Sequence, residues 1–126
     1  ARAATDVTGF GLAGHALNIA RASGLTLRVE LDRLPVHEAF RDMVAKGVST
    51  GATDANRENA RDLFVDRRGL APADSEILFD PQTSGGLLVS TPAGNADALL
   101  RDLLESGHQA AVIGETVEGP PRFEVV

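Results

Sequence analysis

The sequence contains no cysteine among its 126 residues. A disulfide framework, a thiolate metal site and a cysteine nucleophile are therefore excluded within this chain. No apolar run approaches the roughly 20 residues that a membrane-crossing helix needs, and the N-terminus lacks the pattern of a secretory signal peptide. We therefore expect a soluble protein without a membrane partner. The absence of cysteine leaves the redox compartment open, and cytoplasmic localisation is a separate expectation.

Basic residues are in the minority. The chain has 12 Lys and Arg against 18 Asp and Glu, which gives a formal net charge of -6. Such a surplus of negative charge disfavours contact with a phosphate backbone, so we expect no nucleic-acid partner. The P-loop pattern G-x-x-x-x-G-K-[ST] is absent. His37 and His108 lack a second ligand at a diagnostic spacing, so a histidine metal site is not indicated.

The size and hydrophobic content of the chain favour one domain. With 43% hydrophobic residues, the chain is long enough for a single core and too short for two ordinary domains. We therefore expect one domain over residues 1–126. Because the first residue is alanine rather than methionine, we interpret the chain as a piece of a longer protein.

Helical periodicity recurs along the chain. Apolar residues lie at helical spacing over residues 12–23, 36–46 and 93–106, and a further turn or two is expected over 56–64. A glycine follows each of the first three segments and can take the left-handed conformation that ends a helix. Residues 48–56 are instead rich in Gly, Ser, Thr, Asp and Asn, a composition that predicts a loop.

Alternating apolar residues predict a half-buried strand over residues 25–31. Two further strands, over 110–117 and 123–126, are predicted to form a hairpin, and 77–80 and 86–90 are predicted to be short buried segments. The interleaved helices and strands together with this hairpin predict an α+β fold. In it, helices pack on a mixed, largely antiparallel sheet.

The stretch TDVTGFGLAGH, residues 5–15, contains a literal G-x-G-x-x-G from Gly9 to Gly14. Glu30 and Asp32 follow about 20 residues later, where a dinucleotide fold places its ribose-binding carboxylate. However, residues 1–8 contain no run that could form the central strand which such a site requires. The alternative is that the glycines permit a turn and close packing of the following helix.

Asp6 stands just before this glycine turn and admits two interpretations. It could cap the following helix, since Asp side chains accept hydrogen bonds from unpaired N–H groups there. It could also be a metal ligand. A lone carboxylate cannot complete the octahedral oxygen shell of Mg²⁺, so such a site would have to share ligands from elsewhere.

A second stretch, DPQTSGG at residues 80–86, combines a proline that fixes one φ angle with a glycine pair that permits close backbone approach. It is either a tight turn between core segments or a segment that meets a ligand. The candidate binding residues within it are Thr83, Ser84, Gly85 and Gly86. His15, on a helix with small neighbours, is expected to be packed or hydrogen-bonded locally rather than catalytic.

These two stretches, extended to residues 4–15 and 80–90, resemble the C-terminal domain of selenophosphate synthetases (selenide, water dikinases), in the aminoimidazole ribonucleotide synthetase-like superfamily. Between them, Gly51-Ala-Thr-Asp-Ala-Asn56 is similar to the G-G-T-x-x-N element of that family, with Ala52 where a second glycine is common. The resemblance covers essentially the whole chain. It implies that Gly9, Gly11 and Gly14 belong to a family turn and helix start rather than to a dinucleotide fingerprint.

The resemblance implies an enzyme that makes selenophosphate, AMP and phosphate from selenide, ATP and water, with Mg²⁺. The family's reactive residues lie in an N-terminal domain, so this chain is expected to hold no catalytic residue and to be inactive alone. Asp6 matches a metal-binding aspartate of the family. The implied partners are the protein's own N-terminal domain and, for the intact enzyme, a second copy in a homodimer. The alternative is a self-sufficient nucleotide-binding module that uses the Gly9–Gly14 turn.

Overall fold

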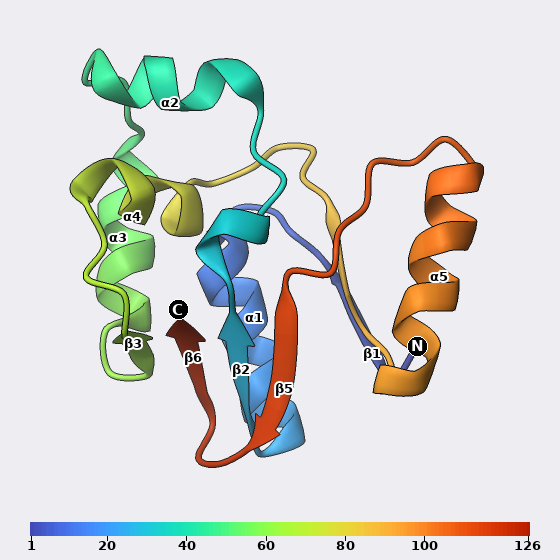
Figure 1. The fold of residues 1–126 in the computed structure, drawn as a ribbon. Helices are drawn as coiled ribbons and strands as arrows, with labels where there is room; N and C mark the ends of the chain where they lie inside the picture. Colours follow the sequence, from blue (N-terminus) through green and yellow to red (C-terminus); the bar gives the residue numbers. More distant parts are fainter.

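The computed structural model describes all residues from 1 to 126 and is drawn in Figure 1. Helices and strands alternate along most of the chain. In order they are β1 (Ala3–Asp6), α1 (Gly11–Ser23), β2 (Leu25–Val29), the 3-10 helix η1 (Leu31–Arg33), α2 (Glu38–Ala45), α3 (Gly51–Ala60), β3 (Phe64–Asp66), α4 (Pro72–Phe79), β4 (Leu87–Ser90), α5 (Ala93–Glu105), β5 (Gly114–Glu118) and β6 (Arg122–Val125). None of the helices is long and apolar enough to span a membrane.

The strands form two sheets, and the predicted α+β class with a mixed sheet is confirmed. The larger sheet has the order β3-β6-β2-β5, and the smaller one consists of β1 and β4. The pairs β1–β4 and β2–β5 are antiparallel, whereas β2–β6 and β3–β6 are parallel. Parallel and antiparallel pairs are thus equally common, whereas the sequence predicted a largely antiparallel sheet.

The predicted hairpin at the C-terminus is wrong. The strands β5 and β6 do not pair with each other but lie on opposite sides of β2. Their connection passes the end of β2, where Thr26 Oγ1 donates a hydrogen bond of 2.7 Å to the carbonyl oxygen of Pro120. Alternation of apolar residues identifies a strand but not its partner, so the sequence could not distinguish the two arrangements. The strand β5 also begins later than predicted, at Gly114.

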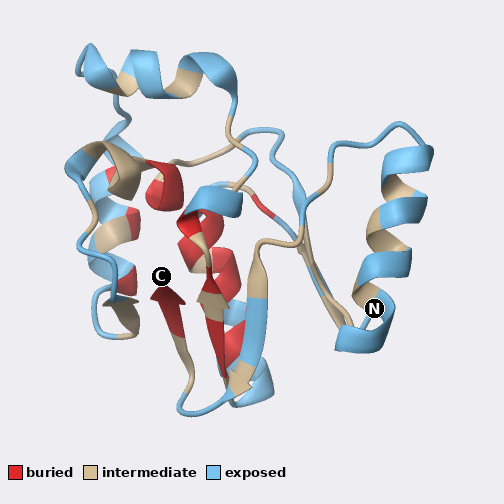
Figure 2. Cartoon of the chain, viewed as in Figure 1, coloured by how far each residue is buried: buried red, intermediate tan, exposed pale blue.

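The core lies between α1 and the four-stranded sheet (Figure 2). Helix α1 is where the sequence predicts it and ends at Gly24, whose φ of 67° is left-handed and whose N–H bonds to Ala20 O. Three fully buried alanines of α1, Ala13, Ala16 and Ala20, leave room for the helix to approach the sheet closely. The sheet contributes buried apolar residues to the same cluster, which are Leu27, Val29, Phe123 and Val125.

The loop predicted over residues 48–56 is wrong in its larger part, because helix α3 begins at Gly51. Its buried residues are Thr53, Asn56 and Ala60, which share one face at helical spacing. Two of the three are polar, so the segment shows no apolar stripe from which a helix could be predicted. The later part of α3 coincides with the turn or two expected from residue 56 onward.

The two short segments expected to be buried have different outcomes. Ile77, Leu78 and Phe79 are buried as predicted, but they form the last part of helix α4, which starts with Pro72 in its first turn. Residues 86–90 contain strand β4, and none of its residues is buried. The helices α2 and α5 coincide with the predicted segments 36–46 and 93–106, yet neither contains a buried residue.

Candidate functional site

The two conspicuous sequence stretches meet in the structure. We call residues 6–11 and 80–86 the paired loops, because strands β1 and β4 bring them together with Asp6 opposite Leu87. Val7 N–H donates to Gly86 O at 2.8 Å, and Gln82 N–H donates to Thr8 O at 3.1 Å. In Figure 1 the strands β1 and β4, which hold the two loops together, run side by side between the four-stranded sheet and α5. Residues far apart in the sequence therefore form one surface.

Two glycines make this close approach of backbones sterically feasible. A Cβ atom on Gly85 would lie 2.2 Å from the carbonyl oxygen of Val7 and 2.5 Å from Oε1 of Gln82. Gly11 has a φ of 69°, and a Cβ there would lie 2.9 to 3.0 Å from backbone atoms of Leu78 and Phe79 at the end of α4. Both positions thus require glycine for packing.

The glycines of the G-x-G-x-x-G pattern accordingly permit a turn and close packing. Strand β1 precedes the turn, but it lies in the two-stranded antiparallel sheet and not in the centre of a parallel sheet. A dinucleotide fingerprint needs a central parallel strand that leads into the helix start. The structure therefore lacks the context of such a site.

Asp6 ends strand β1, and its side chain is exposed. Its carboxylate makes no hydrogen bond or ion pair within the chain; only its carbonyl oxygen accepts a bond, from Thr5 Oγ1. Helix α1 starts after Phe10 and has no side-chain cap. The helix-cap interpretation of Asp6 is therefore not supported, and the carboxylate is available to a group outside the chain.

The predicted binding residues of the second loop, Thr83, Ser84, Gly85 and Gly86, are all exposed. They lie between α4 and β4, next to the turn that follows Asp6. The two hydroxyl side chains make no hydrogen bond within the chain, so they face solvent together with the backbone of the glycine pair. The structure thus brings all five predicted site residues to the two loops that meet each other.

His15 is packed and hydrogen-bonded locally, as expected. Its Nε2 lies 3.1 Å from Thr8 Oγ1, and its ring packs against that of Phe10 with 5.6 Å between the ring centres. No group of three or more His, Asp or Glu side chains in the chain could hold a metal ion. The exposed carboxylate of Asp6 has the hard oxygen chemistry that Mg²⁺ prefers, but it supplies only one side chain to such a site.

Asn56 is a residue of this region whose contacts the sequence did not reveal. Its Nδ2 donates hydrogen bonds of 2.9 Å to the carbonyl oxygens of both Gly9 and Phe79. Gly9 belongs to the first of the paired loops, and Phe79 directly precedes the second. In the sequence, Asn56 stood out only as the last residue of the family element at residues 51–56.

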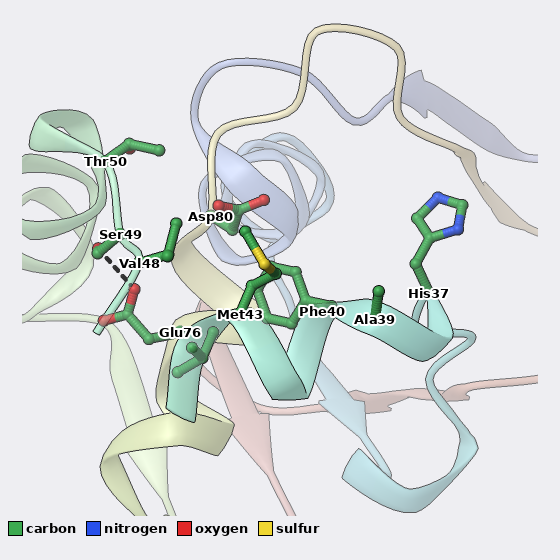
Figure 3. A pocket seen from close by; sticks show the side chains of 10 residues that line it. His37, Ala39, Phe40, Met43, Val48, Ser49, Thr50, Glu76 and Asp80 are labelled. Atoms are coloured by element: carbon green, nitrogen blue, oxygen red, sulfur yellow. Dashed lines mark hydrogen bonds between the residues drawn. The ribbon is translucent and has the colours of Figure 1, made fainter. Parts of the chain in front are cut away.

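A cavity of about 310 Å³ lies beside the second loop, between α2 and α4. Figure 3 shows its mixed lining: Phe40 and Met43 come from α2, while Glu76 and Asp80 are acidic. Ser49 Oγ donates to Glu76 Oε2 at 2.9 Å. Burial raises the pKa of Asp80 above its ordinary value, and the charge of Glu76 acts in the same direction. Of its lining residues, only Asp80 belongs to one of the two motifs, as the first residue of DPQTSGG.

Comparison with known proteins shows to which family this chain is similar. Residues 1–126 match the family model described as AIR synthase related protein, C-terminal domain. Curated relatives named selenide, water dikinase are 46% identical in Burkholderia ambifaria, 41% in Dechloromonas aromatica and 40% in Geobacter metallireducens. These alignments cover 98%, 98% and 100% of this chain but only 35%, 36% and 36% of the relatives. The chain thus spans about a third of their length.

A solved structure supports the fold assignment. Thiamine-monophosphate kinase from Stenotrophomonas maltophilia K279a matches with a TM-score of 0.60 and 22% sequence identity. The match covers 98% of this chain and 30% of that chain, so the fold is shared almost throughout. The resemblance inferred from the two motifs is confirmed by these findings: the chain belongs to the family of AIR synthase related protein C-terminal domains.

Proposed function

We propose that this chain is the C-terminal domain of a selenide, water dikinase, in which it lines part of the cleft for ATP and Mg²⁺. The relatives that carry this name align with nearly the whole chain. The observation that carries the proposal is the meeting of the paired loops, which presents the unpaired carboxylate of Asp6 beside the exposed residues 83–86. The proposed reaction converts selenide, ATP and water into selenophosphate, AMP and phosphate.

Asp6 is the metal ligand in this proposal. An exposed carboxylate without a partner in the chain can donate an oxygen to Mg²⁺, with the remaining ligands supplied by water, phosphate oxygens and the N-terminal domain. Bound Mg²⁺ would neutralise the charge of the triphosphate, which is the main requirement of phosphoryl transfer. The role of Asp6 is to hold negative charge at the edge of the cleft.

Residues Thr83, Ser84, Gly85 and Gly86 shape the wall of the cleft and do not supply a catalytic group. Gly85 lets the second loop lie against the backbone of Val7, next to the exposed residues Thr83 and Ser84. The reactive groups, and most contacts of a homodimer, belong to the N-terminal domain. This chain alone is therefore inactive, and the full-length enzyme acts in the cytoplasm.

The substitution Asp6→Asn in the full-length enzyme tests the metal-ligand role. The amide keeps the shape of the side chain and removes its charge, so turnover should fall by at least about 100-fold, because loss of even an outer-shell partner of a metal ligand costs about 10- to 100-fold. The melting temperature should not change, because the carboxylate has no partner within the chain. Asp97→Asn, on an exposed carboxylate of α5, is the matched control. Near-normal turnover of Asp6→Asn at limiting Mg²⁺ would contradict the proposal.

The alternative, a self-sufficient nucleotide-binding module, makes a different prediction for the isolated chain. Titration calorimetry with ATP or NAD, each with and without Mg²⁺, should show no saturable binding if the cleft needs a second domain. The antiparallel position of β1 disfavours the module, because the Gly9–Gly14 turn then lacks the strand on which such sites depend. Saturable micromolar binding by this chain alone would favour the module instead.

A further inference from the structure

We propose that Asn56 is a positioning residue: its side-chain amide holds the paired loops in the arrangement from which Asp6 reaches the metal. The inference rests on the proposed function and adds a residue to it. Asn56 lies on α3, outside both loops, and its Nδ2 is engaged by two backbone carbonyl oxygens.

The amide of Asn56 connects three segments at once. Nδ2 donates to Gly9 O and to Phe79 O, each at 2.9 Å, so both of its hydrogens are used. Gly9 follows Asp6 by three residues, and Phe79 is the last residue of α4 before the second loop. One side chain therefore joins the first loop and the end of α4, from which the second loop starts, to helix α3.

The chemistry of the contact requires an amide. Asp in place of Asn would bring a carboxylate against two carbonyl oxygens and would have no hydrogen to donate. Asn56 is only 7% exposed, and its bond to Phe79 O is buried, so an unsatisfied carbonyl there could not readily turn to water. Asp therefore cannot replace Asn56 without leaving both backbone carbonyl oxygens without their hydrogen bonds.

Helix α3 provides a firm base for Asn56. The neighbouring Arg57 donates from Nη2 to Glu76 Oε1 at 2.9 Å, and its guanidinium lies 5.4 Å from the centre of the Phe79 ring. These contacts hold α3 against α4. The two backbone hydrogen bonds between the paired loops, from Val7 and from Gln82, join the loops to each other but do not reach α3. Asn56 makes the side-chain hydrogen bonds that attach the first loop, and the residue just before the second loop, to this helix.

Hydrogen exchange on this chain tests the positioning role without any ligand. In Asn56→Asp, the amides of Val7 and Gln82 should exchange about tenfold faster than in the wild type, because Gly9 and Phe79 lose their hydrogen bonds to α3. The amide of Val126, which bonds to Val29 O beside the central strands, should keep its protection. Asn59→Asp is the matched control, since Asn59 is exposed on the same helix. Unchanged exchange at Val7 and Gln82 would overturn the inference.

The Mg²⁺ dependence of the full-length enzyme distinguishes positioning from a merely structural role. Asn56→Asp should raise the Mg²⁺ concentration for half-maximal rate by about tenfold, while kcat at saturating Mg²⁺ recovers to within about twofold. A structural role alone would lower the melting temperature and leave the Mg²⁺ requirement of the folded enzyme unchanged, and that outcome would overturn the inference. Asn56→Ala, which adds no charge, takes the place of Asn56→Asp if the latter does not fold.

The Asp6→Asn variant, measured alongside, separates this inference from the proposed function. If Asp6→Asn retains normal turnover at limiting Mg²⁺, the metal-ligand role fails whatever the Asn56 variants do. If Asp6→Asn loses turnover but the Asn56 variants show a normal Mg²⁺ requirement, only the positioning role fails. Both effects together support the proposal, and combining the substitutions should then give less than the product of the two separate losses.

Discussion

Helices α1 and α5 have the same length and similar sequence patterns but very different surroundings. Each has 13 residues, and in each the apolar side chains recur at helical spacing. Eight residues of α1 are buried, whereas none of α5 is (Figure 2). Periodicity therefore predicts that a helix forms, but not how deeply its apolar face is buried.

The difference follows from what each helix packs on. Helix α1 lies on the four-stranded sheet, and its alanines allow a close fit with Leu27 and Phe123. Helix α5 follows β4 of the two-stranded sheet and lies beyond it in Figure 1. A ribbon of two strands offers little apolar surface to cover a helix. The paired loops lead from β1 into α1 and from α4 into β4, and so connect these two regions.

The largest loss of stability is expected for a substitution in α1. Leu17 is 2% exposed and belongs to the hydrophobic core, so Leu17→Ala leaves a cavity there and should lower the free energy of unfolding by about 3 kcal/mol. Urea denaturation of this chain measures the change. A loss below about 1 kcal/mol would show that the core around α1 is not the main source of stability.

The next largest loss of stability is expected where the paired loops meet. Gly85→Ala would place a Cβ 2.2 Å from the carbonyl oxygen of Val7, so one loop must move. We expect a loss of about 2 kcal/mol, typical of overpacking, in urea denaturation. Gly86→Ala is the matched control, because a Cβ at Gly86 meets no atom within 4 Å. Equal stability of the two variants would contradict the close approach of the loops.

The fold could be predicted from the sequence where patterns are local. Apolar spacing and the left-handed Gly24 identify α1, and alternation identifies β2. Helix α3 was missed because its buried face is polar: Asn56 is buried only because carbonyl groups 47 and 23 residues away accept its hydrogen bonds. Those distant partners leave no trace in a local pattern.

The candidate site could be predicted only in part, for the same reason. Asp6 and residues 83–86 were selected through their motifs and through the family resemblance. That the two motifs form one surface depends on the pairing of β1 with β4, which neither stretch encodes on its own. The need for glycine at position 85 likewise becomes evident only when Val7 is seen opposite it.

A smaller loss of stability is expected for a change at Glu124, a polar residue of the four-stranded sheet. Glu124 is buried, and Arg28 and Arg67 donate to its carboxylate at 3.2 and 2.8 Å. The hydrogen bond from Arg67 is the largest cause that lowers the pKa of Glu124 from 4.5 to about 2. A lowered pKa stabilises the fold above the unfolded value, so this contribution is complete above pH 4.5 and is lost as the pH falls toward about 2.

The urea midpoint, measured from neutral pH downward, should therefore decline below pH 4.5 in the wild type. The Glu124→Gln variant should be less stable at neutral pH, and its difference from the wild type should shrink as the pH falls. Glu105→Gln, on an exposed residue of α5, is the control and should leave the pH profile unchanged. A difference between wild type and Glu124→Gln that stays constant across the range would refute the role of the carboxylate charge.

The smallest effect is expected in α5 and completes the comparison with Leu17. Leu104 is 52% exposed, so Leu104→Ala removes few contacts, and alanine is the better helix former. The free energy of unfolding should change by less than about 0.5 kcal/mol, as for most surface substitutions. Leu17→Ala makes the same chemical change in the other 13-residue helix. The two losses in free energy of unfolding can therefore be compared to show the effect of burial. A loss from Leu104→Ala near that from Leu17→Ala would mean that α5 is anchored as firmly as α1, and the contrast between the two regions would not hold.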